Sequence, residues 1–174
     1  MYFKHCCVYN IVVLMKKNVS PLNNLNFVLY TDGSCFYNSS GVLVAGYASC
    51  TVWDVVESAP LPAVSSAQVA ELIALTRACH IAAGASATIY TDSQYTFGVV
   101  HDFGMLWKQR GFLTSPSHSR KNGPYVAALL DAVLLPSALA IVKCVAHSSS
   151  SNEVALGNDI ADRAAKAAAL SSTG

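Results

Sequence analysis

Two short segments of this 174-residue chain end in the same three residues, and this repetition constrains the fold more than any other feature. The apolar, β-prone runs 27–31 (FVLYT) and 87–91 (ATIYT) lead into Asp32 and Asp92, and each aspartate precedes a small residue. Asp-Gly and Asp-Ser are turn formers, so we expect both strands to stop at these aspartates. The carboxyl ends of strands in α/β sheets are where functional sites gather. The sequence therefore predicts two strands that each present a carboxylate at such an edge.

The remaining pattern of apolar and turn residues predicts an α/β domain with a five-stranded mixed sheet flanked by helices. Its first three strands should form an antiparallel meander. Ser65 and Gln68 fit a capping box at the start of one helix, and Gly84 fits its end. Strands are expected at 27–31, 41–50, 51–58, 87–91 and 138–146, and helices at 65–83, from Ser93, at 124–135 and from Asn158 to about 170.

The length is that of one domain. We expect residues 1–26 to be a tail or linker outside the core, 27–170 to be the domain, and 171–174 to be a short C-terminal tail. Three of the eleven basic residues lie in the N-terminal tail, so the rest of the chain carries eight basic against ten acidic residues. This balance excludes a basic field over the whole surface, and any nucleic-acid surface must be local.

Six cysteines occur without a CxxC or Cys/His ligand spacing, which predicts reduced thiols in an intracellular protein, cytoplasmic or nuclear. The apolar stretch 6–15 is far shorter than the roughly 20 residues needed to cross a membrane. The lysines that follow it and the lack of a small-residue cleavage site argue against a secretory signal. No membrane association is expected.

A third acidic residue, Glu71, lies on the apolar helix expected between the two aspartates. Taken singly, each of the three acids fits an ordinary turn or a solvated helix face. If the three converged, they would repel one another unless a cation lay among them, and oxygen-only ligands suit Mg²⁺ or Mn²⁺. The segment GNDIADRAAK offers two candidates for a fourth carboxylate, Asp159 and Asp162, and helical geometry leaves both open because positions three apart share a face.

The chain resembles a type 1 ribonuclease H, and specifically the ribonuclease H domain of a retroviral reverse transcriptase of the gammaretrovirus-like or endogenous retrovirus branch. The resemblance covers about residues 27–170 and follows the order of that family. The matching segments are YTDGS (30–34), SAQVAELIALT (66–76), YTDSQYTF (90–97), RGFLTS (110–115), His147 and GNDIAD (157–162).

The resemblance implies an Mg²⁺-dependent endoribonuclease that cleaves the RNA strand of RNA–DNA hybrids by two-metal-ion phosphodiester hydrolysis, with Mn²⁺ able to substitute. It implies that Asp162, four residues after Asn158, is the fourth metal ligand, and that Asp159 is not. His147 would be a mobile histidine that assists product release or proton transfer. The implied metal ligands are Asp32, Glu71, Asp92 and Asp162.

Substrate contacts follow from the same resemblance. Gly33 and Ser34 would lie beside the scissile RNA strand, and Gln68, Gln94 and Tyr95 would hold the minor groove and the DNA strand. Asn158 would order the site near Asp162, and the basic residues Lys108 and Arg110 would bind phosphates. Taken without the resemblance, Tyr95 fits a core aromatic equally well. The basic region 101–125 is weaker than is usual in the family, so weak hybrid binding is expected.

The first hypothesis is therefore a monomeric ribonuclease H that binds RNA–DNA hybrids, with a reverse transcriptase polymerase domain as a candidate partner. The second is a catalytically weak or inactive nucleic-acid-binding relic of an endogenous retroelement. The sparse basic surface and the serine run 148–151 beside His147 motivate this second hypothesis. An integrase or transposase would need a different acidic spacing.

Overall fold

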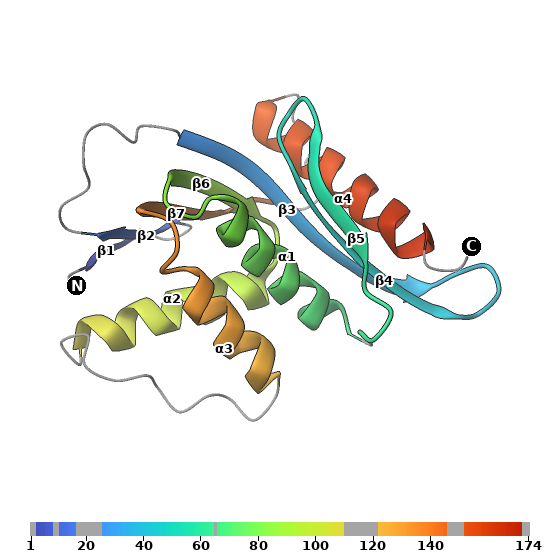
Figure 1. Cartoon of the computed structure of the whole chain (residues 1–174), viewed down its shortest axis with the longest axis horizontal. Coiled ribbons are helices and arrows are strands. Elements are labelled where there is room, and N and C mark those ends of the chain that lie inside the picture. Colours follow the sequence, from blue (N-terminus) through green and yellow to red (C-terminus); the bar gives the residue numbers. More distant parts are fainter. Residues whose placement is uncertain are drawn as a thin grey trace.

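The computed structural model describes residues 3–8, 11–16, 26–64, 66–109, 122–145 and 152–171, of which 3–8, 11–16 and 103–109 are described by their backbone alone (Figure 1). In chain order the elements are β1 (Phe3–Val8), β2 (Ile11–Lys16), β3 (Asn26–Tyr37), β4 (Leu43–Cys50), β5 (Val55–Pro60), α1 (Ala67–Ile81), β6 (Ser86–Thr91), α2 (Gln94–Gln109), α3 (Gly123–Ala132), β7 (Ala138–Lys143) and α4 (Glu153–Ser171).

The sheet confirms the predicted five-stranded mixed architecture and adds to it. Strands β3, β4 and β5 form the antiparallel meander, while β6 pairs in parallel with both β3 and β7. The full strand order is β1-β2-β7-β6-β3-β4-β5. The predicted strands thus occupy five consecutive positions, and an N-terminal hairpin extends the sheet beyond β7.

The two faces of the sheet are covered by different kinds of helix (Figure 1). On one face, Leu29 of β3 packs with Leu72 and Leu75 of α1 in a large apolar core to which α2 and α3 also contribute. On the other face, Tyr30 of β3 packs against small α4 residues such as Ala161. Each fully buried leucine contributes about 2 kcal/mol, so the α1 face supplies most of the hydrophobic stabilisation.

Close approach, rather than large side chains, holds α4 on its face of the sheet. Its buried residues are alanines together with Gly157 and Asn158. A Cβ atom at Gly157 would lie 2.5 Å from ring atoms of Tyr30, so the helix backbone rests directly on that ring. The Tyr30 ring in turn stacks on Tyr90 of β6, with 4.9 Å between centroids. This stack determines how deep the N-terminal half of α4 lies.

Strand β3 does not stop where the sequence predicted. It continues through the expected turn at 32–34 to Tyr37, because β4 supplies a partner for each residue, with Asp32 opposite Ala48 and Ser34 opposite Gly46. Asp32 therefore lies inside a strand. The predicted strand 51–58 is also displaced, since Thr51 and Asp54 form the tight connection that precedes β5.

Two helix starts also differ from the prediction. The N-cap of α1 is Ser66, whose hydroxyl accepts a hydrogen bond from the backbone N–H of Val69, and Ser65 lies outside the described residues. Helix α4 begins at Glu153, five residues before the predicted start at Asn158. Asn152 caps it, with its side-chain oxygen 2.8 Å from the N–H of Ala155. The segment before Asn158 thus has a capping signal that the alanine-rich pattern alone did not reveal.

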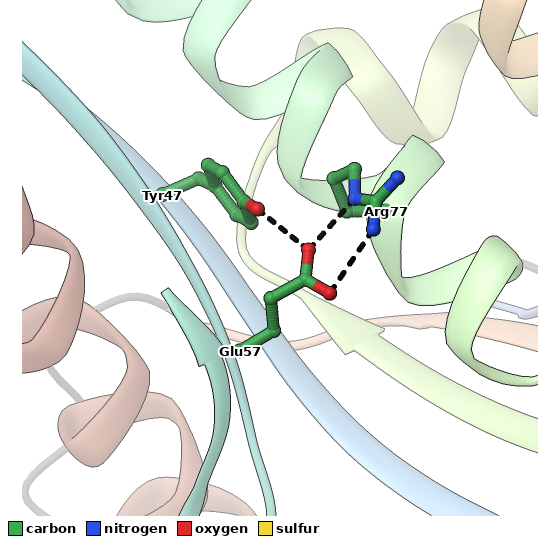
Figure 2. Close-up of polar contacts among 3 residues, drawn as sticks. All are labelled: Tyr47, Glu57 and Arg77. Carbon is green, nitrogen blue, oxygen red and sulfur yellow. Dashed lines mark hydrogen bonds and ion pairs between the residues drawn. The ribbon is translucent and has the colours of Figure 1, made fainter. Parts of the chain in front are cut away.

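A three-residue network ties the edge strand β5 to α1 (Figure 2). The Tyr47 hydroxyl donates to Glu57 at 2.5 Å, and Arg77 donates to the two oxygens of Glu57 at 2.7 and 3.1 Å. The hydrogen bond from Arg77 lowers the pKa of Glu57, while burial and the bond to Glu57 raise the pKa of Tyr47 to about 12. The Arg77 side chain is 43% exposed, so the ion pair contributes at most about 1 kcal/mol and chiefly fixes the position of β5.

The cysteines whose side chains are described are free thiols: Cys35, Cys50, Cys79 and Cys144. The reduced state predicted for all six cysteines stays a prediction, with which these four free thiols are compatible. Burial raises the pKa of Cys79 to about 12, as expected for an inert core thiol. No helix in the described part of the chain is both long enough and apolar enough to cross a membrane.

The N-terminal segment, predicted to be a tail, contains the β1–β2 hairpin. Strand β2 pairs antiparallel with β7 over five positions, from Ile11 opposite Val142 to Met15 opposite Ala138. Helix α2 packs against β1, β2 and β7 together. The hairpin therefore provides hydrogen-bond partners for backbone groups that β7 would otherwise present as an open sheet edge.

We expect Val13→Pro to destabilise the protein, because proline removes a backbone donor from β2 where Val13 lies opposite Ala140 and Cys6. A loss of about 1–3 kcal/mol would lower the melting temperature of a chain of this size by roughly 2–12 °C. Val13→Thr keeps the donor and the strand preference, and serves as the matched control in thermal unfolding. Equal melting temperatures for the two variants would contradict a role for the hairpin in the stability of the domain.

Candidate metal-binding active site

Parallel pairing of β3 with β6 places the first two carboxylates side by side. The last matched pair in the register is Thr31 opposite Thr91. Asp92 follows directly after the end of β6, whereas β3 continues through Asp32 with β4 as its remaining partner. The sheet is thus interrupted on the β6 side at the level of Asp32, and the two aspartates lie at this interruption.

Glu71 of α1 completes a group of three. The side chains of Asp32, Glu71 and Asp92 each offer an oxygen such that these atoms all lie within 4.8 Å of one another. The approach of α1 depends on Gly33, where a Cβ atom would lie 2.2 Å from the carbonyl carbon of Ala70 and 2.4 Å from the backbone nitrogen of Glu71. The backbone of Gly33 also hydrogen-bonds the Glu71 carboxylate. A single glycine therefore sets the distance between the helix and the strand that carry the acids.

The cluster is electrostatically unfavourable without a cation. Burial and the charge of Asp92 raise the pKa of Asp32 to about 7. The pKa of Glu71 is raised well above its ordinary value by burial and by the charge of Asp32, and a hydrogen bond links these two carboxyl groups. In the absence of metal, the site therefore holds a proton at pH values where isolated carboxyl groups have lost theirs.

The residues present fit a divalent cation. Glu71 Oε2 is buried and has no hydrogen-bond partner among the residues that the structure describes. Such an orphaned oxygen costs about 1–3 kcal/mol, and a metal ion would satisfy it. Three convergent carboxylates with no nitrogen or sulfur donor among them are the ligand type that Mg²⁺ and Mn²⁺ prefer.

The two aspartates of α4 have different surroundings. Asp162 has a side chain only 18% exposed, accepts a hydrogen bond from Lys166 Nζ at 2.9 Å, and acts on Asp32 through its charge and a hydrogen bond. Asp159 has a side chain 49% exposed and forms an ion pair with Arg163. The hydrogen bond to Asp162 is the main cause of a raised pKa at Lys166. Asp162 thus lies beside the three-carboxylate group, although its role as a ligand stays a prediction.

Asn158, predicted to order the site near Asp162, is buried where α4 meets the ends of β6 and β7. Its side-chain oxygen accepts a hydrogen bond from Cys144 Sγ at 3.7 Å, and the Cys144 N–H donates to the carbonyl of Thr91 at 2.9 Å. Burial, followed by the charge of Asp92, raises the pKa of the Cys144 thiol to about 11. This chain of contacts connects α4 to the residue that precedes Asp92, which fits a positioning role.

Gln68 and Tyr95, predicted to contact substrate, are brought together by a residue that sequence reasoning missed. Asn122 Nδ2 donates to the Tyr95 hydroxyl at 3.1 Å and to Gln68 Oε1 at 3.5 Å. Asn122 has a left-handed backbone (φ 61°) at the start of α3, a conformation that asparagine tolerates better than most residues. Its place before Gly-Pro at a helix start was the available signal. The Tyr95 ring also packs against the main core, as the core reading of this residue expects, while its contact with substrate stays a prediction.

The other predicted substrate residues vary in their exposure. Gln94 is exposed at the first position of α2, whereas Ser34 is buried within β3. Burial of Ser34 leaves its side chain little contact surface for a nucleic acid. The remaining predicted residues lie outside the described side chains: Lys108, Arg110 and His147.

Comparison with known proteins connects this geometry to a family. The RNase H family pattern matches residues 24–170. The chain is 44% identical over 149 residues to the Gag-Pol polyprotein of feline leukemia virus, which covers 86% of this chain and 9% of the relative. It is 43% identical over 150 residues to the Pol polyprotein of radiation murine leukemia virus, covering 86% of this chain and 26% of the relative. The chain therefore spans a minor part of either polyprotein.

Solved structures share the fold. The solution structure of the PFV RNase H domain superimposes with a TM-score of 0.63 at 21% identity, covering 87% of this chain and 99% of that one. A foamy viral protease-reverse transcriptase, solved in complex with RNA/DNA hybrid, gives a TM-score of 0.62 at 23% identity and covers 90% of this chain and 21% of that one. At these identities the similarity establishes the architecture.

We expect Asp32→Asn to stabilise the metal-free protein increasingly as pH rises from 5 to 7. In this window the folded wild type keeps a proton that the unfolded chain, with an aspartate pKa of 3.8, releases. The free energy of unfolding of the wild type therefore falls as pH rises, by up to about 1.4 kcal/mol per pH unit. Asparagine has no proton to release here, so the variant does not lose this stability.

The measurement is urea unfolding in EDTA at several pH values, with the exposed carboxylate variant Asp131→Asn as control. If the free energy of unfolding depended on pH in the same way for wild type and Asp32→Asn, the raised pKa of Asp32 in the cluster would be contradicted. Mg²⁺ should reduce the difference in the free energy of unfolding between wild type and Asp32→Asn, because a bound cation stabilises the wild-type folded state.

Proposed function

Because the chain belongs to the ribonuclease H family, we propose that it hydrolyses the RNA strand of RNA–DNA hybrids as part of a retroviral-type reverse transcriptase. The family match confirms the enzyme class predicted from the sequence, and the identity to gammaretroviral Pol proteins confirms the predicted branch. The observation that carries the proposal is the convergence of three carboxylates with a buried, unpartnered Glu71 oxygen. That arrangement is costly to the fold unless a cation is bound.

In this proposal Asp32, Glu71, Asp92 and Asp162 hold two Mg²⁺ ions, for which Mn²⁺ can substitute. When bound, such ions supply the charge that activates a water molecule and stabilises the leaving oxygen of a phosphodiester. The protein's own contribution is to fix the carboxylates. Gly33 admits α1 and hydrogen-bonds Glu71, and the Asn158–Cys144–Thr91 contacts hold α4 against the strand that leads to Asp92.

The hybrid would lie across the same edge of the sheet. Gln68 precedes Glu71 by one helical turn, so its amide lies on the same side of α1 as the cluster, and Asn122 joins it to Tyr95. Amide and hydroxyl groups of this kind bind sugar and phosphate oxygens, and 2′-hydroxyl contacts distinguish RNA from DNA. A fold relative solved in complex with RNA/DNA hybrid supports this choice of substrate. The proposed contacts also include Gln94 and the backbone of Gly33 and Ser34, since the Ser34 side chain is buried. Lys108 and Arg110 would bind phosphates, and His147 would assist proton transfer or product release.

A second candidate function is hybrid binding with little or no cleavage. The observation that favours it is the excess of acidic over basic residues outside the N-terminal 26 residues, ten against eight, because phosphate contacts supply most nucleic-acid affinity. A monomer that acts beside a polymerase domain is the form we propose for either function.

We expect wild-type protein to cleave a labelled RNA–DNA hybrid in Mg²⁺, and Asp92→Asn to lose at least about 100-fold in rate, because the neutral amide is a poor metal ligand. Asp131→Asn, in an exposed carboxylate of α3, is the matched control. Equal cleavage by wild type and Asp92→Asn would refute the assignment. Hybrid binding without cleavage by wild type would favour the second candidate.

The two aspartates of α4 provide a second, internally matched test. Asp162→Ala should nearly abolish cleavage, because Asp162 lies beside Asp32, whereas Asp159→Ala should leave the rate within a few-fold of wild type. Both substitutions remove one i,i+4 ion pair from the same helix, and thermal unfolding of each variant separates a loss of activity from a loss of folding. The reverse order of activity would show that the fourth ligand is misassigned.

A further inference from the structure

Helix α4 carries two ion pairs of the same kind in different surroundings. Asp159 pairs with Arg163 and Asp162 pairs with Lys166, each with a spacing of four residues. In the first pair both side chains are well exposed, at 49% and 70%. In the second, Asp162 is 18% exposed and Lys166 is 50% exposed, so the ammonium lies between a largely buried carboxylate and solvent.

The Lys166 ammonium belongs to the electrostatic surroundings of the acidic cluster. It hydrogen-bonds Asp162 Oδ2 at 2.9 Å and also lies in the field of Asp32. Asp162 in turn acts on Asp32 by charge and by a hydrogen bond. Without a metal ion, Lys166 therefore offsets the negative charge that α4 adds to a group of three acids already short of compensation.

We propose that Lys166 is a tethered cation that competes with a divalent ion for Asp162 and thereby sets the metal concentration at which this fourth carboxylate is used. The proposal rests on the metal site of the proposed function. An ammonium and a divalent ion at one carboxylate oxygen repel each other, so binding of metal there displaces Lys166. The flexible four-carbon stem and half-exposed position of Lys166 let its ammonium move into solvent.

The neighbouring pair shows why the effect is specific to Lys166. Arg163 has the same spacing and carries the same charge, and its partner Asp159 is exposed. Removing the charge of Arg163 leaves the hydrogen bond between Lys166 and Asp162 in place, although Asp159, which also acts on Lys166 through its charge, then lacks its partner. The two basic residues thus provide a matched comparison. Lys166 compensates the charge of a predicted metal ligand, whereas Arg163 compensates the charge of a solvated carboxylate.

The test is isothermal titration of Mn²⁺ into wild type, Lys166→Met and Arg163→Met, each free of nucleic acid. Methionine removes the charge and keeps a long side chain with good helix preference. Ion pairs with an exposed partner are weak, so we expect Lys166→Met to tighten Mn²⁺ binding about two- to fivefold. Arg163→Met should match wild type, and Lys166→Arg, which keeps the charge, should stay close to wild type. The Mg²⁺ concentration for half-maximal cleavage should fall for Lys166→Met alone.

If wild type binds Mn²⁺ but Lys166→Met binds it with equal or lower affinity, the inference about Lys166 is wrong and the proposed metal site stands. Equal tightening of Mn²⁺ binding in Arg163→Met would overturn the inference in the same way. Failure of wild type to bind Mn²⁺ would overturn both. Circular dichroism of each variant establishes that the proteins compared are folded, and Lys166→Gln repeats the charge removal with a different side chain.

Discussion

The parallel pairing of β3 with β6 is the constraint on which the rest of the site depends. In this register Thr31 lies opposite Thr91. Strand β6 then ends whereas β3 continues, so that Asp32 and Asp92 meet where the sheet is interrupted. Glu71 joins them from α1, whose close approach Gly33 permits, and Asp162 approaches from α4 on the opposite face. A one-residue slip in this pairing would turn Asp32 toward the other face of the sheet.

The rest of the fold compensates for what this meeting of acids costs. The α1 face buries a continuous set of leucine, isoleucine and valine side chains, whereas the α4 face is packed with alanine and glycine. Large apolar burial therefore anchors Glu71, and close backbone approach sets the depth of Asp162. The Glu57–Arg77 pair fixes the edge of the meander, a structural use of a carboxylate distinct from the three-carboxylate group.

The sequence predicted the sheet and the convergence of Asp32, Glu71 and Asp92 because strand ends and helix faces have fixed periods. It placed the end of β3 wrongly, since Asp-Gly-Ser forms turns in isolation and β4 overrides that preference by pairing with it. The Gly-Pro pair after Asn122 marked a helix start, but the contacts of Asn122 could not be foreseen because they depend on how α3 lies against α1 and α2. The surroundings that distinguish Asp162 from its neighbour likewise depend on the rotation of α4, which local sequence does not determine.

The contact between Gly33 and α1 bears on how such domains lose function over evolutionary time. One added methyl group would lie 2.2 Å from the helix backbone, so α1 would have to move outward and carry Glu71 with it. Such a substitution would disturb the three-carboxylate group while leaving each acid in place and changing no charge. A survey of decayed genomic copies that counted carboxylates alone would score such a domain as intact, and a glycine at this position belongs in the same criterion.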